Sequence, residues 1–157
     1  MLKRVLAFIV LATVCASAWS FDVTDTQGHR HTLADYKGKW VLVNFWATWC
    51  PPCRAEIPDL IALHNQYRNS KLEVLGIAME YNDPNEVTRF AQSMHISYPI
   101  VRGNDAIASQ IGQVQGLPTS YLYNPQGKIV AYQVGALTRE AVEHYINTSH
   151  APAAPRK

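Results

Sequence analysis

Two cysteines separated by a pair of prolines are the residues in this sequence with the clearest chemistry. Cys50 and Cys53 follow an apolar run, residues 40–46, that is typical of a buried strand. Where a strand passes into a helix, free N–H groups and the helix dipole stabilise a thiolate on the first cysteine. The second thiol is close enough to attack a mixed disulfide formed on the first. The spacing therefore favours reversible dithiol–disulfide chemistry, although half of a zinc site has the same spacing.

The residues between the cysteines limit how strongly that thiolate is stabilised. Pro51 and Pro52 have no N–H to donate, so backbone stabilisation of a Cys50 thiolate falls to amides from Cys53 onward. The loop contains no histidine or lysine that would add positive charge. A dithiol form stabilised only modestly predicts a reductant rather than a strong oxidant.

The amino terminus is organised like a secretory signal. Lys3 and Arg4 precede an apolar stretch that ends in Ala16-Ser17-Ala18, an A-x-A cleavage motif. The stretch is shorter than the about 20 apolar residues that a spanning helix needs. We expect residues 1–20 to be a signal peptide cleaved near Ala18 or Ser20, and the protein to be periplasmic or otherwise exported. An uncleaved membrane anchor is the alternative.

Removal of this segment leaves Cys50 and Cys53 as the only cysteines. Disulfides persist in exported proteins, and this pair has no third partner for a separate structural disulfide. Two thiols are also too few for a four-ligand zinc site. We therefore expect no metal and no cofactor beyond the redox-active pair. A lipoprotein cysteine at Cys15 is a further alternative, disfavoured by the bulky Val14 before it.

Length and composition indicate one globular domain. The chain has 157 residues, of which 48% are hydrophobic and 17% charged, enough to bury a core. We expect the domain to span residues 21–148, followed by a flexible tail, 149–157. Without Lys3 and Arg4 the 14 basic residues fall to the number of acidic ones, 12, and no basic stripe suggests nucleic acid.

Hydrophobic periodicity predicts strands that alternate with helices, which is typical of an α/β three-layer sandwich. A short hairpin comes first, and the later hairpin is centred on an Asn-Pro-Gln-Gly turn. The predicted strands are 21–23, 28–32, 40–46, 72–79, 98–101, 119–123 and 128–134. The predicted helices run from the cysteines to about residue 68, from the Asp83 cap onward, over 105–111, and from the Thr138 cap to residue 146.

Four motifs together resemble the thioredoxin superfamily, and within it the TlpA/ResA-like group of exported thiol–disulfide oxidoreductases. They are the signature Asn44–Cys53, the helix start Cys53–Pro58, the loop Gly116–Thr119, and an extra helix and strand at roughly 83–101 that a minimal thioredoxin lacks. The resemblance covers about residues 21–146. It implies a thioredoxin-like three-layer α/β/α sandwich with a mixed central sheet and a TlpA-like central βα insertion.

The resemblance also implies roles for single residues. Cys50, at the exposed end of the pair, would be the nucleophile and Cys53 the resolving thiol. Pro118 matches the family's cis-proline, beside which residue 117 would offer backbone groups to a substrate chain. A trans proline that merely opens a strand is the alternative. The expected substrate-contact residues are Trp49, Pro51, Pro52 and Leu117.

Acid–base assistance is predicted at a position that differs from thioredoxin. Thioredoxin has a buried aspartate where this chain has Asn44, which cannot titrate. The TlpA-like group often has a glutamate after the next strand, where Glu80 stands, so we predict Glu80 as acid/base; an exposed loop acid is the alternative. Glu56 is expected to complement the helix dipole, and His64 to be a packed core residue rather than a ligand.

The implied activity is reduction of disulfides in other proteins. The resemblance implies the haem-binding C-x-x-C-H motif of apocytochrome c or a copper-site dithiol as substrate, and a membrane thiol transporter as electron donor. We expect a monomer. An oxidase or isomerase using the same chemistry stays open, and so does a protein in which both cysteines and a histidine hold Cu(I). Copper proteins of this fold typically space the cysteines by three residues, which argues against the last alternative.

Overall fold

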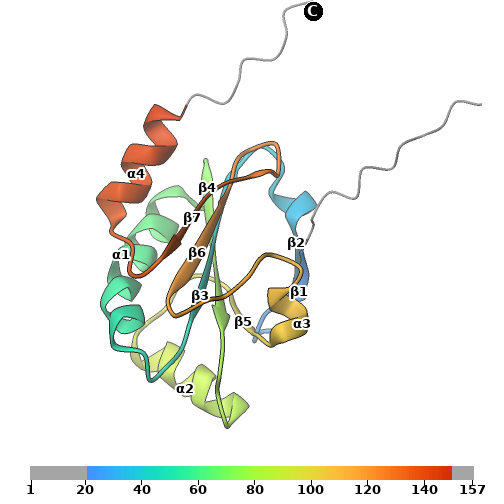
Figure 1. The fold of residues 1–157 in the computed structure, drawn as a ribbon, viewed down its shortest axis with the longest axis vertical. Coiled ribbons are helices and arrows are strands. Elements are labelled where there is room, and N and C mark those ends of the chain that lie inside the picture. Colours follow the sequence, from blue (N-terminus) through green and yellow to red (C-terminus); the bar gives the residue numbers. More distant parts are fainter. Residues whose placement is uncertain (1–20, 150–157) are drawn as a thin grey trace, which may run out of the picture.

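A five-stranded mixed sheet forms the centre of the molecule in this computed structural model, which describes residues 21–149 (Figure 1). Its strand order is β5-β4-β3-β6-β7, with β3 and β5 parallel to β4 and with β6 antiparallel to both β3 and β7. The strands are β3 (Trp40–Trp46), β4 (Leu72–Ala78), β5 (Ile100–Arg102), β6 (Thr119–Tyr123) and β7 (Ile129–Val134). The predicted signal peptide, and the predicted tail beyond Ser149, lie outside the described residues.

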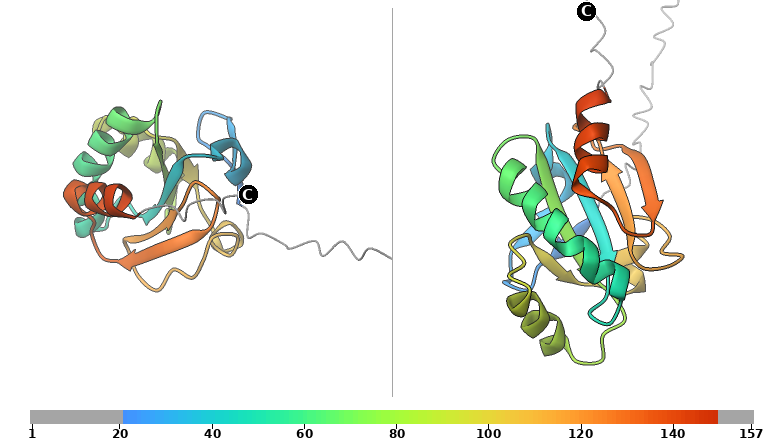
Figure 2. Two further views of the ribbon diagram at one scale, coloured as in Figure 1. Left: turned by 90° about the horizontal axis from the view of Figure 1, so that it is seen from above. Right: turned by 90° about the vertical axis from the view of Figure 1, so that its left-hand side faces the viewer.

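The remaining elements cover the two faces of this sheet (Figure 2). One face carries α1 (Pro51–Tyr67), α2 (Pro84–Ser93) and α4 (Arg139–Thr148). The other carries the hairpin of β1 (Asp22–Thr24) and β2 (Arg30–Thr32), the 3-10 turn η1 (Leu33–Tyr36) and α3 (Asp105–Ala108). The expected three-layer arrangement is therefore confirmed. Within residues 21–149, no helix is both long and apolar enough to cross a bilayer.

Alternation along β3 divides the core into two clusters, one on each face of the sheet. Leu42 and Trp46 pack with α1, α2 and α4, whereas Val43 and Phe45 pack with the N-terminal hairpin and α3. Every residue of β3 and β4 is buried. Continuous apolar runs are expected where both faces of a strand are covered, so the sequence pattern and the architecture agree.

The bounds of some elements differ from the predicted ones for local reasons. The strand predicted at 98–101 begins at Ile100, after Pro99, which has no N–H to contribute to a ladder. The short helix after Asn104 ends at Ala108 rather than at residue 111. Asp83 and Thr138 cap their helices as predicted, each accepting a hydrogen bond from a backbone N–H inside the helix.

Candidate active site

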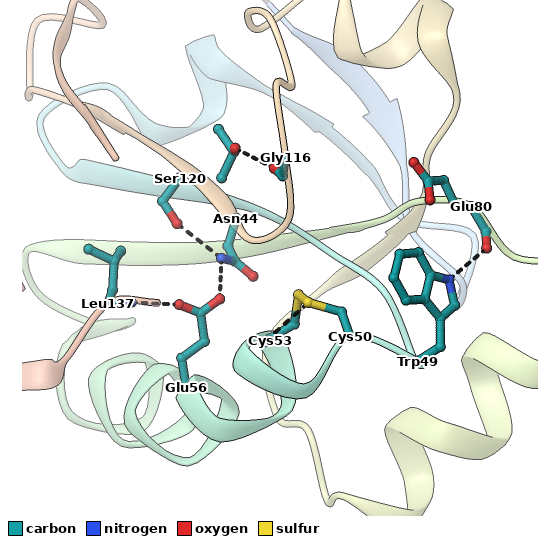
Figure 3. Close-up of a disulfide and its surroundings, with 10 residues drawn as sticks. Asn44, Trp49, Cys50, Cys53, Glu56, Glu80, Gly116, Ser120 and Leu137 are labelled. Carbon is teal, nitrogen blue, oxygen red and sulfur yellow. Dashed lines mark hydrogen bonds between the residues drawn. A yellow bond between two sulfur atoms is a disulfide. The ribbon is translucent and has the colours of Figure 1, made fainter. Parts of the chain in front are cut away.

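The two cysteines form a disulfide at the amino-terminal end of α1 (Figure 3). Cys50 is the N-cap of this helix, and its Sγ accepts a hydrogen bond from the Cys53 N–H at 3.3 Å. Pro51 and Pro52 occupy the first two helical positions, where no intrahelical N–H bond is formed and where the fixed φ of proline suits the helix. The local sequence thus makes the helix begin directly after Cys50, as predicted.

Both cysteines are covered in this oxidised form. Cys50 is 3% exposed and Cys53 is 0% exposed, so the expected exposed end of the pair is only marginally more accessible than the other. What separates the two residues is position, because Cys50 precedes the helix and receives its first free N–H, whereas Cys53 lies within it.

The loop before β6 contains a cis peptide bond between Leu117 and Pro118, in agreement with the resemblance. Pro118 accepts a hydrogen bond from the Gly135 N–H at 2.8 Å, and the Thr119 hydroxyl donates to the Gly116 carbonyl at 2.6 Å. Leu117 is half-buried against the core cluster that contains both cysteines. The structure therefore brings the cis-proline loop and the disulfide together.

A buried carboxylate lies one helical turn beyond Cys53. Glu56 is only 2% exposed, and its two oxygens accept hydrogen bonds from Asn44 Nδ2 at 2.8 Å and from the Leu137 N–H at 2.7 Å (Figure 3). Asn44 also donates to Ser120 Oγ at 3.0 Å. Burial raises the pKa of Glu56 to about 6, against the lowering effect of the Leu137 and Asn44 hydrogen bonds. This carboxyl consequently titrates close to neutral pH, as groups at functional sites often do.

The sequence interpretation of Glu56 was wrong. Glu56 lies beyond the first turn of α1 and points into the core rather than towards the free N–H groups of the helix end. A usable signal was present, because Glu56 is three residues after Cys53 and four before Leu60, on the buried stripe of the helix. This spacing does not by itself indicate burial, because an acidic residue is normally solvated.

Glu80, the predicted acid/base, reaches the site through its backbone. Its carbonyl accepts a hydrogen bond from Trp49 Nε1 at 3.1 Å, and its φ of 52° lies in the left-handed region (Figure 3). The Glu80 side chain is exposed, and its carboxylate makes no hydrogen bond with a residue in the described range. The catalytic role of Glu80 stays a prediction, while Glu56 is the carboxylate that the fold buries beside the pair.

The helix of the predicted insertion supports the cysteine loop, a contact that the sequence did not reveal. Thr48 donates a hydrogen bond to the carboxylate of Glu86 on α2. The Phe90 ring of α2 lies 5.5 Å from the Trp46 ring, centroid to centroid. The guanidinium of Arg54 lies over the Phe90 ring, 5.5 Å from its centroid. The inserted helix therefore packs against both the strand end and the helix start that hold the disulfide.

The other aromatic and histidine predictions concern burial. Trp46 is fully buried as expected, whereas Trp49 is 57% exposed beside the disulfide. His64 is a packed core residue as predicted, and its Nδ1 lies 2.9 Å from Glu73 Oε1. Over residues 21–149, no three His, Cys, Asp or Glu side chains are grouped so that they would hold a metal ion.

Known proteins similar to this chain are named for thiol–disulfide chemistry. Residues 14–132 match the AhpC/TSA family. The thiol-disulfide oxidoreductase ResA of Geobacillus kaustophilus is 34% identical over 136 residues, 86% of this chain and 77% of that protein. ResA of Bacillus subtilis is 33% identical over 132 residues, 84% of this chain and 73% of that protein.

Solved structures agree with the sequence comparison. A thiol:disulfide interchange protein of the thioredoxin family from Chlorobium tepidum has a TM-score of 0.74 at 29% identity, covering 82% of this chain and 91% of its own. A DsbF homologue from Corynebacterium diphtheriae has a TM-score of 0.75 at 28% identity, covering 83% and 84%. With its thioredoxin-like fold and its Cys50–Cys53 disulfide, the chain therefore belongs to the AhpC/TSA family and is a thiol–disulfide oxidoreductase.

Proposed function

We propose that the protein is an exported reductase of protein disulfides. In its dithiol form, the Cys50 thiolate attacks one sulfur of a client disulfide, and the other client sulfur leaves as a thiolate that takes up a proton. Cys53 then loses its proton and attacks Cys50 Sγ, which releases the client's second thiol. Two electrons pass to the client, and the protein is left with the Cys50–Cys53 disulfide.

One contact carries the assignment of Cys50 as the attacking thiol. Its Sγ accepts the Cys53 N–H at the end of α1, where the helix dipole favours negative charge. A sulfur held as a hydrogen-bond acceptor in this way is also the one on which a thiolate is stabilised. Cys53, completely buried within the helix, suits the resolving step.

A trapping experiment tests this assignment. In Cys53→Ala the resolving thiol is missing, so mixed disulfides with client proteins should accumulate on Cys50. Cys50→Ala is the matched control and should accumulate almost none. The adducts are counted on non-reducing gels of the protein purified from its host, and the reverse pattern would contradict the assignment.

The direction of the reaction is supported by what surrounds the pair. The two prolines withhold two N–H groups, and the guanidinium of Arg54 is engaged by the Phe90 ring on α2. Glu56, one turn beyond Cys53, adds a negative charge above pH 6 that disfavours a thiolate nearby. A dithiol form without strong thiolate stabilisation predicts a potential nearer ~−270 mV than ~−120 mV.

Equilibration of the protein against glutathione or dithiothreitol redox buffers measures this potential. A value above about −150 mV would favour the oxidase or isomerase alternative over the reductase. Titration of the reduced protein with Cu(I) separates the copper-binding alternative, which requires stoichiometric tight binding that is lost in Cys50→Ala.

Export, clients and electron donor complete the proposal. The signal-like segment before Phe21 supports export, with cleavage near Ala18 or Ser20, and mass spectrometry of the protein from its native host tests this. The client class is the C-x-x-C-H disulfide of apocytochrome c or a copper-site dithiol, and a membrane thiol transporter keeps a monomeric protein reduced. Reduction of a synthetic C-x-x-C-H disulfide peptide, compared with a scrambled loop of equal composition, tests the client class.

A further inference from the structure

The exposed apolar side chains of this protein gather on one strand. Trp49 lies beside the disulfide, and every other large hydrophobic side chain exposed within residues 21–149 belongs to β7. No charged residue interrupts this strand. Sheet edges are commonly protected by charge or proline, and exposed apolar patches mark interaction sites. The β7 side chains are Ile129 (39% exposed), Val130 (40%), Tyr132 (62%) and Val134 (48%).

The two edges of the central sheet differ in whether another segment of the chain covers them. At the β5 edge, the Thr26 N–H donates to the Ile100 carbonyl at 2.7 Å and Asp25 forms a bridge with Val101, so a loop covers this short strand. At the other edge, β7 pairs only with β6 among the strands of the described chain. One edge is therefore closed, and the other is open.

The free backbone groups of β7 can be identified from its hydrogen bonds. The Gly135 N–H points towards β6, where it donates to the Pro118 carbonyl at 2.8 Å. Because backbone groups alternate in direction along a strand, those of Tyr132 and Val134 point outwards. The next outward carbonyl, that of Val130, accepts the Tyr145 hydroxyl at 3.1 Å. The open part of the edge thus runs from Tyr132 to Val134.

This open part adjoins the active site. β7 runs parallel to β3, because each is antiparallel to β6, so it ends on the side of the sheet where α1 begins (Figure 1). Directly after β7, Gly135 bonds to the cis-proline and the Leu137 N–H bonds to Glu56 on α1. A polypeptide held at Cys50 beside Pro118 therefore has this edge within reach.

We propose that the open edge of β7 docks an extended, uncharged apolar segment of the client polypeptide while its disulfide is engaged at Cys50. The inference rests on the proposed reductase function and adds a second contact to it. Backbone groups of the client pair with those of Tyr132 and Val134, and its alternate side chains meet the apolar strand surface. A hollow of about 230 Å³ between β7 and α4, lined by residues that include Leu122, Ala131 and Tyr145, accepts side chains on one face.

A client fits this edge better than a second copy of the chain does. Stable dimers bury about 1,200 Å² or more in total, far beyond what self-pairing of an edge open over three residues would supply. A weak contact suffices for a client, because a segment already tethered at Cys50 meets the edge at a high effective concentration.

Two synthetic peptide disulfides test the proposal on the reduced full-length protein. Both contain the same disulfide loop; one continues into six alternating valines and threonines, the other into six glycines and serines. At subsaturating concentration the first should be reduced about tenfold faster, as two to three cross-strand pairs imply. Tyr132→Lys should remove this preference, and Tyr132→Phe should keep it. Gln126→Lys adds the same charge at the exposed turn before β7 and should also keep it.

A methylated form of the first peptide separates backbone hydrogen bonding to β7 from nonspecific hydrophobic contact. Two versions are made, one with the odd-numbered and one with the even-numbered backbone amides of the Val/Thr flank methylated. A methylated amide cannot donate to β7, so the version that methylates the amides facing β7 should lose the tenfold gain. This arm uses the unmodified protein, so it decides the matter even if Tyr132→Lys fails to fold. Equal rates for both flanks, or a gain that survives methylation in both versions, would overturn the β7 proposal.

Two further measurements distinguish a failure of the reductase function from pairing of β7 with a second copy of the chain. Reduction of hydroxyethyl disulfide should proceed equally in the protein and its three variants; if the unmodified protein cannot reduce it, the reductase function itself fails. A concentration-dependent dimer in analytical ultracentrifugation that Tyr132→Lys converts to a monomer would show that the edge pairs with a second copy, and would overturn docking of a client.

Discussion

Two glutamates near the disulfide, Glu56 and Glu80, have opposite environments. Glu56 is buried on α1, each of its oxygens accepts a hydrogen bond, and its pKa is raised to about 6. Glu80 follows β4 with an exposed side chain, and within residues 21–149 it contacts the site only through its carbonyl, which accepts the Trp49 indole N–H. Nearness to the cysteines therefore does not set the environment of an acid; burial and hydrogen bonding do.

The difference has a physical consequence for the two sides of the disulfide. On the α1 side, Glu56 connects three segments distant in sequence, because it bonds to β3 at Asn44 and to the loop before α4 at Leu137. On the other side, Glu80 supplies a main-chain acceptor, which does not depend on its carboxylate. We therefore expect side-chain changes at residue 56 to alter stability and chemistry, and those at residue 80 to alter neither strongly.

The largest expected contrast is in stability. Glu56→Ala should lower the free energy of unfolding by about 3 kcal/mol at pH 7, because a buried donor, Asn44 Nδ2, and a part-buried one, the Leu137 N–H, lose their acceptor. Glu80→Ala should change it by no more than about 0.5 kcal/mol, as surface substitutions usually do. Urea unfolding of the oxidised proteins measures both values, and equal losses would show that burial does not separate the two acids.

The pH dependence of stability gives the next contrast. A raised carboxyl pKa means that the native state holds the Glu56 proton more tightly than the unfolded chain does. This contribution to stability is therefore full below about pH 4.5 and is lost as pH rises through about 6. The change amounts to about 2 kcal/mol. Urea midpoints taken from pH 4.5 to 7 should fall for the unmodified protein and for Glu80→Gln, and should flatten for Glu56→Gln.

Thiol reactivity tests which acid the chemistry uses. The sequence predicted Glu80, whereas the geometry favours Glu56 as the charge that opposes thiolate formation. In Glu56→Gln the midpoint of the pH–rate profile for alkylation of the reduced protein should move down by about one pH unit. Glu80→Gln should leave the profile in place. A shift seen with Glu80→Gln alone would restore the assignment made from the sequence.

The smallest expected effect tests whether Glu80 contributes to stability through its backbone carbonyl rather than through its side chain. Trp49→Phe removes the indole N–H that donates to the Glu80 carbonyl and should cost about 1 kcal/mol of stability, the usual net contribution of one hydrogen bond and more than is expected for Glu80→Ala. No change of the Glu80 side chain should reproduce that loss. If Glu80→Ala and Trp49→Phe were equally destabilising, as measured by thermal unfolding at several urea concentrations, the side chain would have a role that its exposure does not suggest.

Sequence reasoning succeeded where the determining interactions are local. The strand 40–46, the start of α1 at the prolines and the caps at Asp83 and Thr138 follow from neighbouring residues, and all were predicted. The disulfide pair is local too, because Cys50 and Cys53 lie one helical turn apart. The cis bond at Pro118 came from the family resemblance, and no local pattern in this chain specifies it.

What the sequence by itself determined is the chemistry of the pair and the elements that hold it. Only the tertiary structure decided which acid stands beside it, because the partners of Glu56 come from residues 44 and 137, and the helix rotation that buries Glu56 is set by packing on the sheet. The same holds for β7, whose residues are those of an ordinary strand. Its exposure arises because it is the last strand of the sheet and because no loop within residues 21–149 covers its outer edge from Tyr132 to Val134.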